Sequence, residues 1–381
     1  VALALGGCGK AIDRNTELIT TTQTTTVTTT AQTTTTTAPV TTTEKKTTTK
    51  KKEPEEIKYS YKDTLEIYQK ITIGEWITDA NVKPDNADDL VPTDNMGKNE
   101  LTVKFGGKKQ KLSYNVADTT PPQFIYCPGV IEVHKGSGFE PSVYMGYGDN
   151  YDKAPSIVYE GSVDTKTPGL YDITLTVTDS SGNSASKDVT VSIVDSIDQG
   201  QSDIPLSDFG EFKEKYSSDS ADVGIDVSYW QGDIDFKKVK AAGCNFVFVR
   251  AAHHSDDIYP DENFFKNVDN ATEAGLDVGV YFYSSCRSPE QAGQQAQWVI
   301  DKLAGRQLAL PIAFDWESFD RFQRFGMSIH DLNECYRAFK EVIEENGYKA
   351  ILYSSKNFLE NIWYTQGEDI WLANYTEQTE Y

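Results

Sequence analysis

From Val223 onward, short apolar runs alternate with segments whose apolar residues recur at helical spacing. Phe264, Val268 and Ala271 illustrate the helical spacing, and Gly275 follows them as a stop signal. Near-continuous apolar strands separated by amphipathic helices predict a parallel sheet covered by helices. Repeated strand–helix units favour a barrel, with an open doubly wound sheet as the alternative. The predicted strands are residues 224–228, 246–249, 278–283, a run ending at 317, 350–353 and 370–373.

The middle of the chain shows a different pattern, in which apolar and polar residues alternate with a period of two. This pattern occurs twice, because residues 101–105 and 111–118 correspond to residues 169–179 and 188–195. Residues 180–183, Ser-Ser-Gly-Asn, predict a hairpin turn in the second copy. The Thr-Val-Thr-Asp-Ser-Ser-Gly-Asn stretch and the Asp-Thr-Thr-Pro-Pro joint resemble bacterial Ig-like surface modules. That resemblance implies two small all-β sandwich modules that act as spacers.

The N-terminal part of the chain offers few apolar residues to bury. Residues 16–49 are dominated by threonine, which predicts a disordered stalk because burial cannot offset the entropy of ordering. The apolar stretch 1–8 indicates the end of a secretory signal. Leu-Gly-Gly-Cys at its end resembles a bacterial lipobox, which implies a lipid on Cys8, with a chance cysteine as the alternative. The predicted segments are a signal end (1–8), a Thr-rich linker (9–56), two Ig-like modules (57–118 and 119–196), a linker (197–221) and a catalytic domain (222–381).

Charge and cysteine content narrow the function further. A formal net charge of −22 argues against nucleic acid and against charge-driven binding to anionic lipids. The five cysteines show neither Cys-x-x-Cys nor Cys/His spacing, so we predict no zinc site and no disulfide framework. We therefore expect no cofactor and no metal. We also expect a monomer that contacts the membrane only through its lipid anchor.

Asp315 and Glu317 lie at the end of a buried apolar run, in the sequence Phe-Asp-Trp-Glu. A strand places residues i and i+2 on one face, so both carboxyl groups would project from the strand's C-terminal tip. Glycosidic bond cleavage usually needs two such groups, one that gives a proton and one that meets developing positive charge. A pair of solvated loop acids is the alternative, and the strand–helix context favours catalysis. The other residues at predicted C-terminal strand ends are Asp226, Arg250, Tyr283 and Tyr375.

A series of motifs in the C-terminal segment resembles glycoside hydrolase family 25, the Chalaropsis-type lysozymes. It begins with Gly-Ile-Asp-Val-Ser-Tyr-Trp-Gln-Gly at residues 224–232, includes residues 314–317 and ends with Trp-Leu-Ala-Asn-Tyr at 371–375. The resemblance implies an irregular TIM-type barrel. It also implies hydrolysis of the β-1,4 bond between N-acetylmuramic acid and N-acetylglucosamine in peptidoglycan. The family's last two strands would follow Tyr375, so we expect a truncated barrel and a sequence that continues.

The resemblance also assigns roles to single residues. Glu317 would be the general acid that protonates the leaving oxygen. Asp315 would stabilise the transition state, and Asp226 would complete an acidic floor. Packing of the barrel rim explains the aromatic candidates equally well. The residues that would bind substrate are Tyr283, Tyr353, Trp371, Tyr375 and Arg250.

These observations predict a lipid-anchored muramidase at the outer face of the bacterial membrane or in the cell wall, acting on peptidoglycan glycan strands. A non-catalytic surface adhesin whose barrel binds cell-wall glycan is the alternative, because Ig-like spacers suit it equally well. A family 18 chitinase fits less well. A resemblance to that family would imply a longer Asp-x-x-Asp-x-Asp-x-Glu run, and Ala309 and Phe314 do not fit such a series of acidic residues. A metal-dependent hydrolase is weakly supported, because no histidine accompanies the acids at ligand spacing.

Overall fold

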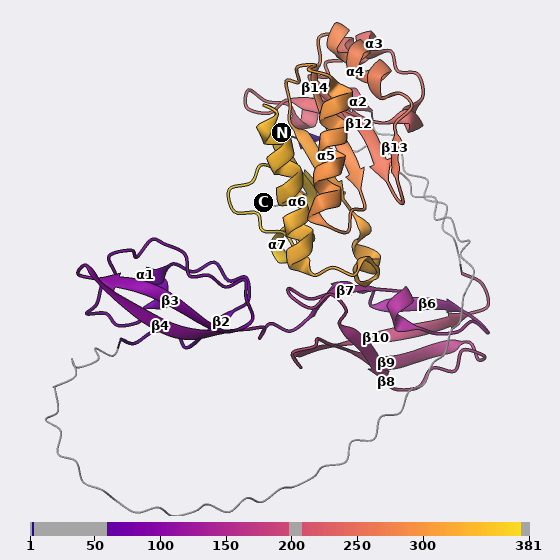
Figure 1. The fold of residues 1–381 in the computed structure, drawn as a ribbon. Helices are drawn as coiled ribbons and strands as arrows, with labels where there is room; N and C mark the ends of the chain where they lie inside the picture. The colour runs from indigo at the N-terminus through magenta and orange to yellow at the C-terminus, as the bar shows by residue number, and fades with distance from the viewer. Residues whose placement is uncertain (1, 4–58, 198–207, 375–381) are drawn as a thin grey trace, which may run out of the picture.

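The computed structural model describes residues 2–3, 59–197 and 208–374 (Figure 1). The predicted lipidation site Cys8, the threonine-rich linker and Tyr375 lie outside these residues. Within the described part of the chain, no helix combines the length and the apolar character needed to cross a membrane.

The C-terminal part forms one sheet whose main strands follow one another in chain order. Each neighbouring pair is parallel. The doubly wound alternative is wrong for these strands, because that fold requires a reversal of the strand order. The strands are β11 (Val223–Val227), β12 (Phe246–His254), β14 (Asp277–Ser284), β15 (Ile312–Trp316), β16 (Ala350–Ser355) and β17 (Ile370–Ala373).

This sheet is curled into an open half-barrel. The ring of Trp371 on β17 lies 4.5 Å from the ring of Phe248 on β12, although β14, β15 and β16 separate the two strands within the sheet. β1 (Ala2–Leu3) extends the β11 edge in parallel, and β13 (Ile258–Pro260) pairs antiparallel with the end of β12. The described strands do not close a cylinder, so the complete TIM-type barrel and its missing strands stay predictions.

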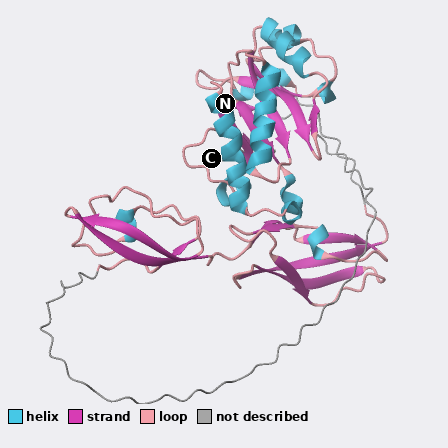
Figure 2. Cartoon of the chain, in the orientation of Figure 1, coloured by secondary structure: helices cyan, strands magenta, loops and turns pink. Residues whose placement is uncertain are grey.

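Helices connect the strands and cover the outer face of the sheet, as Figures 1 and 2 show for α5 and α6. Local sequence determines where these helices begin. Ser288 accepts a hydrogen bond from the Gln291 N–H at the start of α5, and Ser328 forms a capping box with Asp331 at the start of α6. The helical elements are η2 (Tyr229–Gln231), α3 (Phe236–Ala241), α4 (Phe264–Glu273), α5 (Pro289–Leu303), η3 (Ser318–Phe325), α6 (Ile329–Glu345) and α7 (Lys356–Asn361).

Alternation along the strands creates two apolar layers. On β12, Val247 and Val249 belong to the main core beneath the helices, whereas Phe246 and Phe248 belong to a smaller ring cluster on the concave face. Gly224 on the neighbouring strand makes room for these rings, since a Cβ there would lie 2.4 Å from the Phe246 ring. The concave face is therefore packed with aromatic side chains rather than hollow.

The two β-rich segments share a strand arrangement. In the first, β3 and β4 form a hairpin and β2 lies parallel to β4; in the second, β9 and β10 form a hairpin and β6 lies parallel to β10. The predicted repeat is thus confirmed at the level of strand pairing. The strands are β2 (Thr64–Glu66), β3 (Gly97–Phe105), β4 (Lys108–Ala117), β6 (Val130–His134), β9 (Gly169–Thr178) and β10 (Ser184–Val194).

Beyond this shared arrangement the segments differ. The second adds β8 (Ser156–Glu160) and a separate sheet of β5 (Gln123–Tyr126) and β7 (Gly146–Gly148), with η1 (Pro141–Val143) between β6 and β7. The described residues of the first segment hold a single three-stranded sheet and α1 (Ile73–Trp76). The two sheets of the predicted sandwich are not seen in these described residues, whose single sheet packs against the fully buried Trp76 ring.

The predicted linker 197–221 contains a helix, α2 (Phe209–Tyr216). Asp208 begins it by accepting a hydrogen bond from the Glu211 N–H. Phe209 packs against the main core of the C-terminal part. Residues 209–216 of the predicted linker are therefore helical, because a polar composition concealed apolar residues at helical spacing.

The second β-rich segment packs against η3, and β7 lies beside this end of the C-terminal part in Figure 1. A Cβ on Gly146 of β7 would lie 1.7 Å from the Phe319 carbonyl oxygen, so the two backbones are in direct contact. Ile125 of β5 joins the main core. The Gln323 amide donates to two backbone carbonyls of the segment, at 2.8 and 3.0 Å. The helix that directly follows Glu317 is therefore held by the Ig-like segment.

Candidate active site

Parallel pairing places a row of candidate residues at one level of the sheet. Tyr283 on β14 is aligned with Asp315 on β15, Asp315 with Tyr353 on β16, and Tyr353 with Trp371 on β17. Aligned residues of neighbouring strands point to the same face. That face is the concave one, because Tyr353 and Trp371 pack in its ring cluster.

Asp226 reaches the same face from β11, where it is aligned with Phe248 of the ring cluster. Burial raises the pKa of the Asp226 carboxyl to about 7, and the negative charge of Glu317 adds to the shift. This electrostatic effect means that Asp226 and Glu317 are neighbours in space although they are far apart in sequence. Near neutral pH, Asp226 therefore exchanges between its protonated and ionised forms.

Asp315 and Glu317 lie at the tip of β15, as predicted. Asp315 is buried within the strand, and Glu317, the first residue after it, is half-buried. Trp316 between them faces the main core, where its indole N–H donates to the Cys286 carbonyl at 3.2 Å. We call Asp226, Asp315 and Glu317 the sheet acids, since two strands of one sheet bring them to its concave side.

The predicted sugar-binding rings have different surroundings. Tyr283 and Tyr353 are half-buried. Trp371 is 8% exposed and packs among the rings of Phe248, Tyr281 and Tyr353. For Trp371, the structure therefore favours the packing explanation over sugar binding. Tyr375 falls outside the described residues.

Arg250, predicted to bind substrate, is buried in an ion pair. Its Nε and Nη2 each lie 2.9 Å from an Asp261 carboxylate oxygen, which also accepts the Tyr229 backbone N–H at 2.9 Å. The guanidinium lies 5.0 Å from the centre of the Tyr229 ring. Arg250 thus links β12 to η2 and positions the turn after Asp226. Sequence analysis missed Asp261, whose Asx turn with Asn263 is a local signal for such a residue.

Trp230 is a second residue that sequence analysis did not single out for a role. Its side chain is 63% exposed on η2, which begins directly after β11, and its ring lies 4.4 Å from that of Tyr229. An exposed tryptophan at the carboxyl end of a sheet strand presents an apolar face on the side of the sheet where ligands bind. The sequence signal that could have identified Trp230 is its position in the motif at residues 224–232, at the start of the C-terminal domain.

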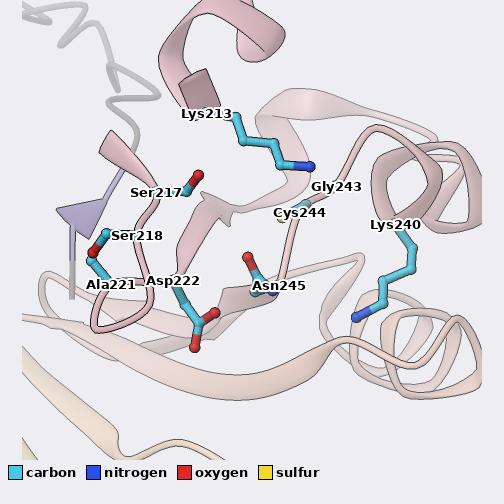
Figure 3. Close-up of a pocket in the computed structure, with 9 residues that line it drawn as sticks. All are labelled: Lys213, Ser217, Ser218, Ala221, Asp222, Lys240, Gly243, Cys244 and Asn245. Carbon is cyan, nitrogen blue, oxygen red and sulfur yellow. The ribbon is translucent and has the colours of Figure 1, made fainter. Parts of the chain in front are cut away.

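Two other features of the described residues lie away from the sheet acids. A cavity of about 330 Å³ is lined by α2 and by the residues that precede β11 and β12, including Asp222 and Asn245 (Figure 3). That is the amino end of the sheet, opposite to the end where such folds place their chemistry. Acidic side chains with metal-ligand spacing also occur, but in the β-rich part of the chain.

Two family models match the chain. The model described as Glycosyl hydrolases family 25 matches residues 225–381, and the one described as Bacterial surface protein, Ig-like domain, matches residues 129–193. Both resemblances that the motifs suggested are thereby confirmed for these residues. The predicted lipobox and the first β-rich segment lie outside both matches.

Two lysozymes are similar to part of the chain. The autolytic lysozyme of Clostridium acetobutylicum is 27% identical over 154 residues, which are 40% of this chain and 44% of that protein. Lysozyme M1 of Streptomyces globisporus is 41% identical over 61 residues, 16% of this chain and 20% of that protein. The chain therefore spans less than half the length of these relatives. A solved family 25 glycosyl hydrolase from Bacillus anthracis is 26% identical with a TM-score of 0.37, covering 43% of this chain and 76% of that one.

Proposed function

We propose that residues 222–381 form a lysozyme domain that hydrolyses the β-1,4 bond between N-acetylmuramic acid and N-acetylglucosamine in peptidoglycan. The observation that carries the proposal is the meeting of Asp226 and Glu317 beside Asp315 on the concave side of the sheet. The match to family 25 and the similarity to two lysozymes support the same substrate class.

In the proposed mechanism, Glu317 donates a proton to the glycosidic oxygen while the bond from that oxygen to the anomeric carbon breaks. Asp315 stabilises the positive charge that develops on the sugar. Water then adds to the anomeric carbon and loses one proton to a carboxylate of the site, which replaces the proton that Glu317 gave to the leaving oxygen. Asp226 exchanges its own proton near neutral pH, so it adjusts the charge that Glu317 experiences.

Substitution of Glu317 tests this assignment. Release of reducing ends from purified peptidoglycan would be measured for Glu317→Gln and for Glu341→Gln, which makes the same chemical change at an exposed position on α6. We expect the first variant to be inactive and the second to match the unmodified chain. Near-normal hydrolysis by Glu317→Gln would reject Glu317 as the acid.

A second candidate function is a surface adhesin whose C-terminal domain binds cell-wall glycan without cleaving it. The match of residues 129–193 to a bacterial surface Ig-like domain is the observation that favours it. An adhesin would sediment with peptidoglycan and release no reducing ends. Its binding would also be unaffected by Glu317→Gln.

The proposed lysozyme acts outside the cell, since peptidoglycan lies there. We propose that Cys8 carries a lipid that keeps the protein on the outer face of the membrane, and that the protein works as a monomer. Metabolic labelling with a fatty acid would test the anchor, because a Cys8→Ser variant would lose the label.

A further inference from the structure

Three aspartates from separate strand ends meet in the β-rich part of the chain. Asp118 follows β4, Asp149 follows β7 and Asp179 follows β9. They are 5%, 1% and 6% exposed, and one carboxylate oxygen of each lies within 4.8 Å of the others. We call them the joint acids, because Asp118 lies where the first β-rich segment meets the second.

Hydrogen bonds hold each carboxylate in place, but some of the carboxylate oxygens have no hydrogen-bond partner. Asp118 Oδ2 accepts from the Ser181 hydroxyl at 2.8 Å, and Asp149 Oδ1 accepts from two backbone N–H groups at 2.7 and 2.9 Å. Asp179 accepts from the backbone and the amide of Asn183. Asp118 Oδ1 and Asp149 Oδ2 are buried without a hydrogen-bond partner, and so is Asn150 Oδ1. Buried polar atoms rarely stay unpaired, so these oxygens indicate a ligand.

The charges of the joint acids are also uncompensated by protein groups. Within the described ranges, no lysine or arginine forms an ion pair with any of the three. The pKa of Asp118 is raised to about 6, chiefly by burial and in addition by the nearby charges of Asp149 and Asp179. Three neighbouring acids in a dry site are costly unless a positive charge joins them.

We propose that the joint acids bind a calcium ion. The ligand atoms of the three aspartates are carboxylate oxygens with no nitrogen or sulfur among them, which suits a hard cation. Ca²⁺ accepts six to eight oxygens in flexible geometry, whereas Mg²⁺ prefers to keep several of its waters. A site with several buried protein oxygens and few routes for water therefore favours Ca²⁺.

The ion would join three parts of the molecule. The Asn150 amide donates to Glu66 of β2 at 3.1 Å, which connects the site to the first β-rich segment. The Asp149 carbonyl accepts the backbone N–H of Ile329, the first residue of α6, at 2.7 Å. Calcium would therefore stiffen the connection between both β-rich segments and the C-terminal domain.

Thermal unfolding of the complete chain tests the proposal. After removal of metals with EDTA and dialysis, the melting temperature would be followed as CaCl₂ is added to the millimolar range, and binding would be measured by calorimetry. We expect a rise in melting temperature for the unmodified chain and for Asp188→Asn, an exposed position of the same segment. Asp149→Asn should bind Ca²⁺ at least about tenfold more weakly, because it loses one ligand charge.

Asp118→Asn provides a second variant with an effect of opposite sign. Removing a buried charge should raise the melting temperature of the metal-free protein, while the stabilisation by calcium is reduced. The absence of calcium binding to the unmodified chain would overturn the proposal. An equal response to MgCl₂ would overturn the choice of metal. Stabilisation by acid alone, with no effect of calcium, would show that the acids share a proton instead.

Discussion

The sheet acids and the joint acids are both sets of three carboxylates assembled from separate strands, but their surroundings differ. Among the sheet acids, Asp226 and Glu317 are half-buried and so remain accessible from one side. The joint acids are all buried, and hydrogen bonds hold each of them in place. Accessibility suits exchange of protons and substrate, whereas fixed and buried oxygens suit a permanently bound ion.

A carboxylate cluster alone therefore does not define a function in this chain. Burial raises the pKa of carboxyl groups in both sets, that of Asp226 to about 7, that of Asp118 to about 6 and also that of Asp149. The discriminating features are the aromatic neighbours of the sheet acids and the hydrogen bonds that hold each of the joint acids. Substitutions that affect the two sets differently will sharpen this comparison.

The largest expected difference concerns hydrolysis. Glu317→Gln should lower the rate of reducing-end release by at least about 10²-fold, because it removes the proton donor. Asp149→Asn should change that rate by less than about threefold in saturating calcium, because the joint acids take no part in the chemistry. Initial rates on purified peptidoglycan would measure both. Similar losses in the two variants would mean that the two sites are not separate.

The next largest effect concerns the contact between the second β-rich segment and η3. Gly146→Ala places a Cβ 1.7 Å from the Phe319 carbonyl oxygen, and neither backbone can yield easily. We expect a loss of about 1–3 kcal/mol in the free energy of unfolding, as for other overpacked contacts. The rate of hydrolysis should also fall, because Phe319 follows Glu317 by two residues.

Gly129→Ala is the matched control, since nothing lies within 4 Å of its added Cβ and the position is exposed. Urea unfolding and hydrolysis rates would be compared for the two variants. Equal stability of Gly146→Ala and Gly129→Ala would show that the β-rich segment does not pack on η3 in solution.

A smaller effect concerns the dependence of stability on pH. The pKa of Asp226 is raised from 3.8 to about 7, so the folded state binds more protons than the unfolded state between these values. Stability at this site is therefore present at acid pH and falls as pH rises through that window. Asp226→Asn should remove this fall in stability. Relative to the unmodified chain, the variant's gain in melting temperature should be about 2–4 °C larger at pH 7.5 than at pH 4. If the stability of Asp226→Asn fell with rising pH as steeply as that of the unmodified chain, the raised pKa of Asp226 would be contradicted.

The sequence predicted the sheet acids because their signals are local. Asp315 and Glu317 are two residues apart at the end of an apolar run, and Asp226 ends another strand of the same kind. The joint acids escaped detection because Asp118, Asp149 and Asp179 follow strands of three separate sheets, and only the packing of these sheets brings them together. The metal-free prediction rested on histidine and cysteine spacing, which carries no information on sites made of oxygen ligands.

Other differences from the prediction have a similar physical origin. The apolar runs of the C-terminal part have a strong periodicity, and its six main strands formed as expected. Helix α2 was missed because its polar residues outnumber the three rings that guide its packing. The packing of Gly146 on η3 depends on shape complementarity between segments far apart in sequence, which no local pattern records.

The smallest predicted effect concerns Trp230 and separates binding from chemistry. If its 63% exposed ring stacks on a sugar, Trp230→Ala should raise KM for peptidoglycan fragments by about two- to tenfold, equivalent to ~0.5–1.5 kcal/mol. kcat should change little, because stacking on a sugar stabilises the bound substrate and the transition state alike. Phe265→Ala, which removes an exposed ring from α4, should leave both constants unchanged. A fall in kcat with constant KM would instead assign Trp230 to positioning Asp226, since η2 begins where β11 ends.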